Sequence, residues 1–217
     1  MKNSDASITN RRRVLLGTAF AGVAAATSQA TKAAPMAGDL TADDIRGLLK
    51  LEPNATCGYV RVTFQTQQRI APGGLPAPFA DGRPLGSALY FLVTPEAPVR
   101  LHRIRNDQLY HYYLGDPLEV FLLHADDSVE RVIVGPDLRA GQRVQLLIPG
   151  NTFHTARLMR PIGWFLGAST EWPGVVPADV EIGNLDELCG KYPAAAADIR
   201  AIADSVRQVA PAGGGPR

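Results

Sequence analysis

The chain has 217 residues, 46% of them hydrophobic, which is enough for the core of one domain. Its formal net charge of +1 supplies no field that would attract nucleic acid or an anionic membrane, so we expect neither as a partner. The 21 glycines and 17 prolines predict many turns, and this composition favours an all-β fold.

The first segment, residues 1–34, has the pattern of an export signal. Arg11, Arg12 and Arg13 precede a short apolar run that ends near Ala26, and small residues follow it. The run is shorter than the ~20 residues of a membrane span. The paired arginines resemble a twin-arginine signal, while an ordinary secretory signal and a disordered tail are the alternatives. We expect this segment to be cleaved, leaving a periplasmic or secreted protein that does not contact the membrane.

Residues 40–193 are expected to form the folded domain. Thr41 and an acidic first turn predict a short helix. The Pro/Gly-rich stretch 70–84 predicts a loop, which either gates a site or is only a flexible excursion. Helices are predicted after residue 174, and residues 194–217 should be a C-terminal helix and a disordered tail. Apolar runs bounded by turn residues predict strands at 58–66, 87–93, 99–102, 109–114, 118–124, 129–134, 142–148, 152–158 and 163–169.

Two of these stretches carry three of the chain's four histidines. They are VRLHRIRNDQLYHYYLG, residues 99–115, and LLIPGNTFHTAR, residues 146–157. Because alternate side chains of a strand share a face, Gln108, Tyr110 and Tyr112 should point one way and His111 the other. A bulge would change this parity. Without one, His111 belongs to the outer wall or to a subunit contact.

The first stretch resembles the first signature motif of the cupin superfamily. That motif has two histidines separated by one residue, then a glutamate and a glycine. His102 and Gly115 match it, whereas Ile104 stands at the second histidine and Gln108 at the glutamate.

The second stretch resembles the second cupin motif, because Pro149 is followed five positions later by His154. The phrases CGYVRVTF, GSALYFLV and PGVVPADVEIGNLDELCGKYP extend the resemblance to the poorly characterised cupin subfamily labelled DUF985. The resemblance implies a double-stranded β-helix, the jelly-roll barrel of cupins, with a short N-terminal helix and C-terminal helices.

One phrase departs from that subfamily. Its members usually read histidine, proline, glutamate, glycine, glycine, tyrosine, whereas this chain reads Asn-Ala-Thr-Cys-Gly-Tyr at residues 54–59. The histidine and the glutamate are therefore lost, and a site assumed for the subfamily is altered or absent here. Cys57 and Cys189 are the only cysteines, and we expect two buried thiols in preference to a disulfide.

The resemblance also implies a candidate metal site. Cupins normally hold a divalent transition metal with imidazoles and one carboxylate. His102, Gln108 and His154 are the matching ligands, but one histidine is missing and an amide replaces the carboxylate, so metal affinity should be low. Alternatively, the two histidines hydrogen-bond to neighbouring groups without a metal.

Sugar epimerases of the superfamily use a pocket histidine as base and a tyrosine as acid, which implies His102 with Tyr110 or Tyr112 as the catalytic residues here. Core packing is the alternative role for these tyrosines. The residues expected to contact the ligand are Tyr59, Arg61, Gln108, Gln145 and His154.

Three functions remain open at this point. The first is an isomerase or epimerase acting on a small polar, carbohydrate-like ligand, and the second is a metal-dependent oxygenase or hydrolase. The third is a barrel that binds a ligand without catalysis. Because open sheet edges tend to be paired, we also expect a homodimer.

Overall fold

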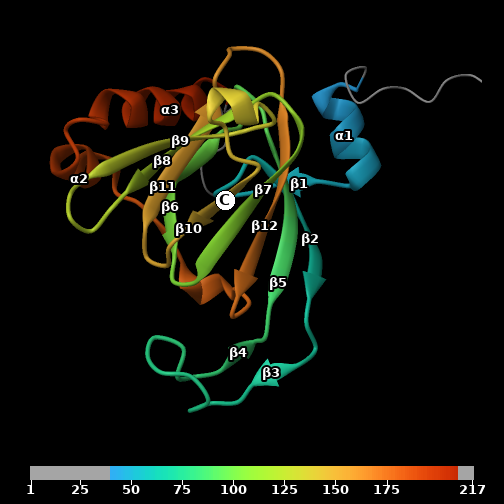
Figure 1. Ribbon diagram of the computed structural model, residues 1–217, viewed down its shortest axis with the longest axis vertical. Coiled ribbons are helices and arrows are strands. Elements are labelled where there is room, and N and C mark those ends of the chain that lie inside the picture. The colour runs from blue at the N-terminus through green and yellow to red at the C-terminus, as the bar shows by residue number, and fades with distance from the viewer. Residues whose placement is uncertain (1–39, 210–217) are drawn as a thin grey trace, which may run out of the picture. The chain divides into compact units, whose positions relative to one another are not determined.

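A computed structural model describes residues 40–209 of the chain (Figure 1). The predicted export signal and the predicted disordered tail after residue 210 lie outside these residues. Within residues 40–209, no helix has the length and apolar character required to cross a membrane.

Two antiparallel sheets make up most of the domain (Figure 1). In spatial order, the six-stranded sheet consists of β1 (Glu52–Pro53), β2 (Tyr59–Gln65), β5 (Ser87–Val93), β12 (Phe165–Trp172), β7 (Asp107–Gly115) and β10 (Gln145–Ile148). The five-stranded sheet consists of β13 (Val180–Ile182), β6 (Val99–Ile104), β11 (Phe153–Leu158), β8 (Leu118–Leu123) and β9 (Val129–Val134). Each sheet combines strands that are distant in sequence, which is the pattern of a jelly roll.

The main core lies between the two sheets. Phe91, Tyr110 and Phe165 come from the six-stranded sheet, and they form one buried cluster with Leu122 and Ala156 of the five-stranded sheet. Their alternation with outward-facing residues is what turns the period-two sequence pattern into a closed interior. The predicted all-β fold with short helices is therefore confirmed.

The helix α1 (Ala42–Leu49) covers part of the outer face of the six-stranded sheet (Figure 1). Thr41 is its N-cap, as predicted, and forms a capping box with Asp44. The buried side chain of Ile45 packs against Leu92 of β5 and Leu166 of β12. Because the helix packs there, β5 and β12 carry apolar side chains on their outer face as well as on their inner face.

The helices α2 (Leu185–Lys191) and α3 (Ala196–Val209) cover the five-stranded sheet on its outer side (Figure 1). Leu188 and Ile199 of these helices join a buried cluster with Leu101 of β6 and Leu123 of β8. Helices thus cover part of the outer side of each sheet, and strands form most of the inner cavity.

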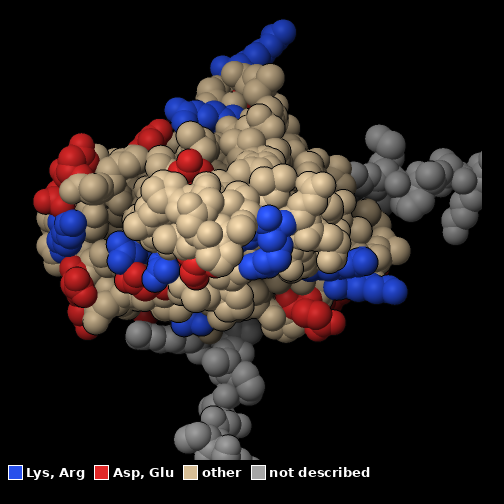
Figure 2. All heavy atoms as spheres, turned by 90° about the horizontal axis from the view of Figure 1, so that it is seen from below, with Lys and Arg blue, Asp and Glu red and all other residues tan. Residues whose placement is uncertain are grey.

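The predicted loop at residues 70–84 is an arm that extends from β2 and β5 (Figure 1). Its ends pair as β3 (Arg69–Ile70) and β4 (Arg83–Pro84). The buried Arg83 guanidinium holds the base of the arm, because its Nε and Nη2 donate to the buried carboxylate of Asp179 at 3.1 and 2.9 Å. Asp179 ends the short 3₁₀ helix η3 (Pro177–Asp179). Viewed from the end that carries the arm, the surface has a broad uncharged area with most charged side chains toward its margin (Figure 2).

Candidate functional site

Two histidines face each other inside the sandwich. His102 on β6 is directly opposite His154 on β11, and opposed residues on neighbouring antiparallel strands present their side chains to the same face. Their ring centroids are 4.2 Å apart, and both side chains are buried. The convergence predicted from the two motifs is therefore present.

Backbone carbonyls fix the tautomer of both rings. The Nδ1 atom of His102 lies 2.7 Å from the carbonyl oxygen of Arg100, and that of His154 lies 3.2 Å from the carbonyl oxygen of Thr152. A carbonyl oxygen only accepts, so each Nδ1 carries a proton and each Nε2 has a lone pair.

Burial keeps both imidazoles neutral at pH 7. Desolvation lowers the pKa of His102 to about 4, although the carbonyl of Arg100 opposes the shift. It lowers the pKa of His154 well below the ordinary value, and repulsion from His102 adds to the effect. The two rings together thus present two neutral lone pairs rather than a charged pair.

The two lone pairs differ in what they meet. The Tyr110 hydroxyl donates to Nε2 of His154 at 3.1 Å, and it lies 3.9 Å from the Cys57 sulfur. Burial raises the pKa of Tyr110 well above its ordinary value, so this hydroxyl keeps its proton. Among residues 40–209, by contrast, no side chain or backbone group hydrogen-bonds to Nε2 of His102. His102 is therefore the histidine with a lone pair available to a ligand.

His102 lines a cavity of about 350 Å³ between the two sheets. Most of the wall is apolar, and three buried polar side chains interrupt it. A largely apolar pocket with a few convergent polar groups is the usual form of a small-molecule site. The apolar members include Val60, Val62, Leu89, Ile104 and Val176, and the buried polar members are His102, Gln108 and Glu171.

Gln108 and Glu171 are direct neighbours across β7 and β12. Gln108 is only 5% exposed, and its amide has no hydrogen-bond partner within the described part of the chain. Glu171 is 3% exposed and accepts from the hydroxyls of Ser87, at 2.7 Å, and Ser169. Burial raises the pKa of Glu171, and the two serine hydrogen bonds oppose that shift.

Glu171 was not predicted from the sequence. The strand predicted at residues 163–169 ends before it, whereas β12 continues to Trp172. The signal was nevertheless present, because Phe165, Ser169 and Glu171 follow a period of two and all are buried. Extending the predicted strand by one step of that period would have placed a carboxyl in the cavity.

The expected ligand contacts Tyr59 and Arg61 lie outside the cavity. The Arg46 guanidinium of α1 stacks 4.1 Å from the centre of the Tyr59 ring, and Arg61 donates to the carbonyl oxygen of Leu49 at 3.1 Å. These two side chains do share one face of β2, as predicted, but it is the face that α1 covers. Val60 and Val62, on the other face, line the cavity instead.

Gln145 is also on the outer face. Its Nε2 lies 3.0 Å from Nδ1 of His111, and Nε2 of His111 lies 3.0 Å from the hydroxyl of Thr170. Leu146 and Ile148, the alternate residues of β10, are the buried ones. The expectation that Gln145 contacts the ligand is therefore wrong, while the outer-wall interpretation of His111 is correct.

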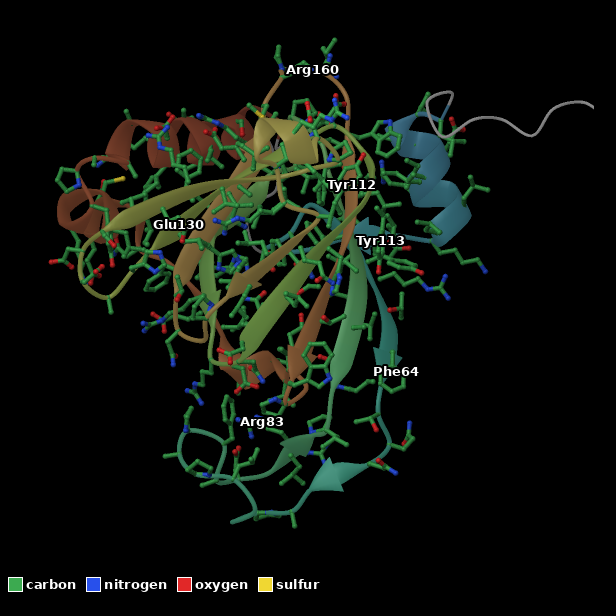
Figure 3. The ribbon with its side chains drawn as sticks, viewed as in Figure 1. Phe64, Arg83, Tyr112, Tyr113, Glu130 and Arg160 are labelled. Atoms are coloured by element: carbon green, nitrogen blue, oxygen red, sulfur yellow. The ribbon has the colours of Figure 1, made fainter. Side chains whose placement is uncertain are left out.

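Neither candidate tyrosine lines the cavity. Tyr110 is buried, and its hydroxyl is hydrogen-bonded to His154. Tyr112 shares the inward face, as predicted, but its hydroxyl donates to the carbonyl oxygen of Gly115 at 2.8 Å. Tyr112 lies in the upper half of the domain in Figure 3, and Arg83 lies at its lower end, where the arm begins. The cavity is near the Arg83 end, because its wall includes Val176 and Pro177 next to the Asp179 ion pair.

The residues present do not fit the metal that cupin resemblance implies. Within residues 40–209, no group of three or more His, Cys, Asp and Glu side chains is arranged to hold a metal ion. The lone pair of His154 already accepts the Tyr110 hydroxyl, and Gln108 offers a neutral amide where a carboxylate would offset the charge of the ion. The proposed metal set of His102, Gln108 and His154 thus has too few ionic or imidazole donors.

Both cysteines have free, buried thiols, as expected. Burial raises the pKa of Cys57 to about 11, so its thiol is protonated at neutral pH. It borders the cavity as an uncharged group.

Comparisons with known proteins identify the same fold. A family model described as "Cupin superfamily (DUF985)" matches residues 44–183. A hypothetical protein from Leishmania major is 26% identical, with a TM-score of 0.67 over 74% of this chain and 97% of its own. A protein from Shewanella oneidensis is 24% identical, with a TM-score of 0.66 over 75% of this chain and 97% of its own. No curated protein sequence matches.

Proposed function

Since the chain belongs to the DUF985 family of the cupin superfamily, we propose that it binds a small polar ligand in the cavity and isomerises or epimerises it by acid–base catalysis. The observation that carries this proposal is the Nε2 lone pair of His102. It is neutral at pH 7, unpartnered within residues 40–209, and exposed to a cavity large enough for a small molecule. A carbohydrate-like ligand fits the mixture of valines and polar groups in the wall.

In this proposal, Nε2 of His102 removes a proton from a carbon atom next to a carbonyl group of the ligand, which gives an enolate and an imidazolium, and the imidazolium then returns the proton to carbon. The carbonyl of Arg100 holds the ring through Nδ1 and favours the imidazolium that forms as the proton moves to Nε2. Gln108 supplies an amide to orient the ligand oxygen. Because burial lowers the pKa of His102, the base is fully deprotonated at neutral pH but intrinsically weak. A nearby carboxylate would favour the transition state, and the Glu171 side chain lies in the same wall.

A non-catalytic ligand-binding barrel is the second candidate. The observation that favours it is the hydrogen bonding of the two tyrosines. The Tyr110 hydroxyl donates to His154 and the Tyr112 hydroxyl donates to the carbonyl oxygen of Gly115, so neither can give a proton to a ligand. A metal-dependent oxygenase or hydrolase finds no comparable support in the donor set.

The substitution His102→Asn tests this proposal. Asparagine retains an N–H for the carbonyl of Arg100 and removes the Nε2 lone pair. Candidate hydroxy-aldehydes, hydroxy-ketones and sugars would be screened by NMR for binding and for exchange of carbon-bound hydrogen with D₂O. We expect His102→Asn to slow exchange about 100-fold or more, as for loss of a general base. His111→Asn, on the outer face, is the matched control and should leave exchange unchanged.

Two outcomes decide between the candidates. Ligand binding with no exchange by the wild-type protein would exclude the catalytic proposal and favour the binding barrel. Exchange that continues at the wild-type rate in His102→Asn would remove His102 from its proposed role.

We also propose export and homodimerisation. The arginine-flanked apolar segment supports export into the periplasm or medium, and N-terminal sequencing of protein from those fractions would test it.

The edge strand β2 supports a dimer, since β1 pairs only with Tyr59 and Val60 among the described residues. Beyond that pair, Phe64 is 57% exposed, as expected for an edge that a second copy covers. Phe64 is labelled in Figure 3, and sedimentation of Phe64→Lys should show a monomer if the edge is the contact.

A further inference from the structure

We infer that the cavity accepts uncharged or cationic ligands and rejects anionic ones, and that Glu171 is the residue responsible for this selection. The inference rests on the proposed function, because it assumes that a small molecule binds in this cavity. It narrows the ligand to a chemical class: a neutral hydroxy-carbonyl compound, polyol or amide, or an amine, but not a carboxylate or a phosphate.

The charge of the cavity wall is the first argument. No lysine or arginine lines the cavity formed by the described residues. Of its ionisable members, His102 is neutral at pH 7 because burial lowers its pKa to about 4, and the Cys57 thiol is neutral because burial raises its pKa to about 11. Glu171 is therefore the side chain that sets the sign of the charge there.

Two arginines whose charge could offset that of an anion, Arg83 and Arg61, have partners outside the cavity. Arg83 donates to Asp179 beside the cavity wall, so that pair has no net charge to offer a ligand. Arg61, which we expected to contact the ligand, is exposed on the outer face of β2 and donates to the carbonyl oxygen of Leu49 at the end of α1. An anionic ligand would consequently enter without a counter-charge.

The geometry of Glu171 is the second argument. The backbone N–H of Val175 donates to the Ser87 hydroxyl at 3.1 Å, which directs the Ser87 hydrogen to Glu171 at 2.7 Å. The Ser169 hydroxyl donates to the other carboxylate oxygen. Each oxygen therefore receives one protein hydrogen bond, and an ionised carboxylate has about four acceptor sites. The remaining sites accept a ligand O–H or N–H.

The neighbouring amide completes the recognition of a neutral ligand. Gln108 lies opposite Glu171 across β7 and β12, is 5% exposed, and has no partner within residues 40–209. Its amide can both donate and accept, so it suits a ligand carbonyl or hydroxyl. The amide faces the cavity without a protein partner, so water or a ligand must satisfy it. The wall thus offers one fixed acceptor and one adaptable group beside His102.

The magnitude of the selection follows from the surroundings. Two like charges a few ångströms apart in a water-poor cavity repel strongly, and the repulsion is screened much less by salt than at the surface. We expect an anion to bind on the order of 100-fold more weakly than a neutral molecule of the same shape. Replacing the carboxylate by a neutral group should remove most of this factor.

The experiment uses full-length protein and probes matched in shape but not in charge. The probes are lactamide, 1-amino-2-propanol and lactate, together with the larger set of mandelamide, 2-amino-1-phenylethanol and mandelate. Binding is followed at pH 7 through the ¹⁵N chemical shift of the His102 ring. Glu171→Gln removes the charge and keeps the shape, and Glu171→Met removes the charge without requiring the serine hydrogen bonds. His111→Asn, on the outer face of β7, is the matched control that leaves the cavity wall and its charge in place.

We expect the amide or the amine of at least one set to shift His102 at concentrations about 100-fold below those needed by the matching acid. Both Glu171 variants should bring the acid within a few-fold of its amide, while His111→Asn should keep the discrimination. A carboxylate that binds wild-type protein as tightly as its amide overturns this inference and leaves the proposed site intact. If no probe of any charge shifts His102 in any variant, the proposed function fails, and the inference fails with it.

Discussion

The buried neutral imidazole of His102 makes the stability of the protein sensitive to mild acid. Its pKa is about 4 in the folded protein, against 6.5 for an unperturbed histidine. Between these values the unfolded chain binds more protons than the folded one, so the free energy of unfolding falls as the pH falls. One pKa unit corresponds to 1.36 kcal/mol, so His102 accounts for about 3 kcal/mol over the whole range and about 2 kcal/mol between pH 7 and pH 5.

Other groups act in the same pH window. His154, whose pKa is also lowered, adds to the loss, because it too is neutral when folded and charged when unfolded. Glu171 opposes the loss, because its raised pKa makes the folded protein take up a proton before the unfolded chain does. The total pH dependence is consequently a sum of several groups, and a variant is needed to isolate His102.

Urea unfolding of wild-type protein and of His102→Asn at pH 7 and pH 5 measures this contribution. The asparagine keeps the hydrogen bond to the carbonyl of Arg100 and does not titrate. We expect the variant to lose about 2 kcal/mol less than the wild type on acidification. His111→Asn, which alters a partly buried ring on the outer face, should retain most of the wild-type loss. Equal pH dependence in wild type and His102→Asn would refute a buried neutral imidazole at this position.

Three further substitutions test other parts of the structure. Arg83→Met leaves the buried Asp179 carboxylate unpaired and should lower the free energy of unfolding by about 3–5 kcal/mol. Adding Asp179→Leu should make this loss smaller. Equal losses for the single and double variants in urea unfolding would argue against the ion pair. Tyr110→Phe removes the donor to the second imidazole and should cost about 1–3 kcal/mol in the same assay, so an unchanged melt would contradict the hydrogen bond. Gln108→Glu sets a second carboxyl opposite Glu171, so thermal melts should show a loss of about 1 kcal/mol at pH 7 that shrinks at pH 5. A loss that does not depend on pH would point to packing instead of charge.

Strand periodicity predicted which side chains share a face, but not which face is inside. On β2 the prediction grouped Tyr59 with Arg61 correctly, yet assigned the group to the cavity. The assignment failed because α1 covers the outer face of this strand, so that both faces carry buried or half-buried groups. The same ambiguity misplaced Gln145, whose neighbours in β10 fill the core. The alternation of side chains in one strand shows which residues share a face. Which of the two faces is buried is known only when the neighbouring sheet or helix is placed.

The histidine pair was accessible to sequence reasoning because each member lies in a motif of fixed spacing. The register that places His102 against His154 then follows from antiparallel pairing of β6 with β11. Glu171 had only the period of two of its own strand as a signal, and the Arg83–Asp179 pair had none. Arg83 and Asp179 are 96 positions apart, and a long-range pair of this kind has no local pattern. That Glu171 lies opposite Gln108 became visible only when β7 and β12 were brought side by side.

The ring nitrogens of His102 give the most direct test of the central claim, that this residue offers a neutral lone pair to the cavity. Long-range ¹H–¹⁵N NMR spectra of the histidine side chains distinguish the two neutral tautomers from the imidazolium. At pH 7 we predict a neutral His102 ring with its proton on Nδ1, which titrates only near pH 4. An imidazolium at pH 7, or a neutral ring with the proton on Nε2, would contradict the account.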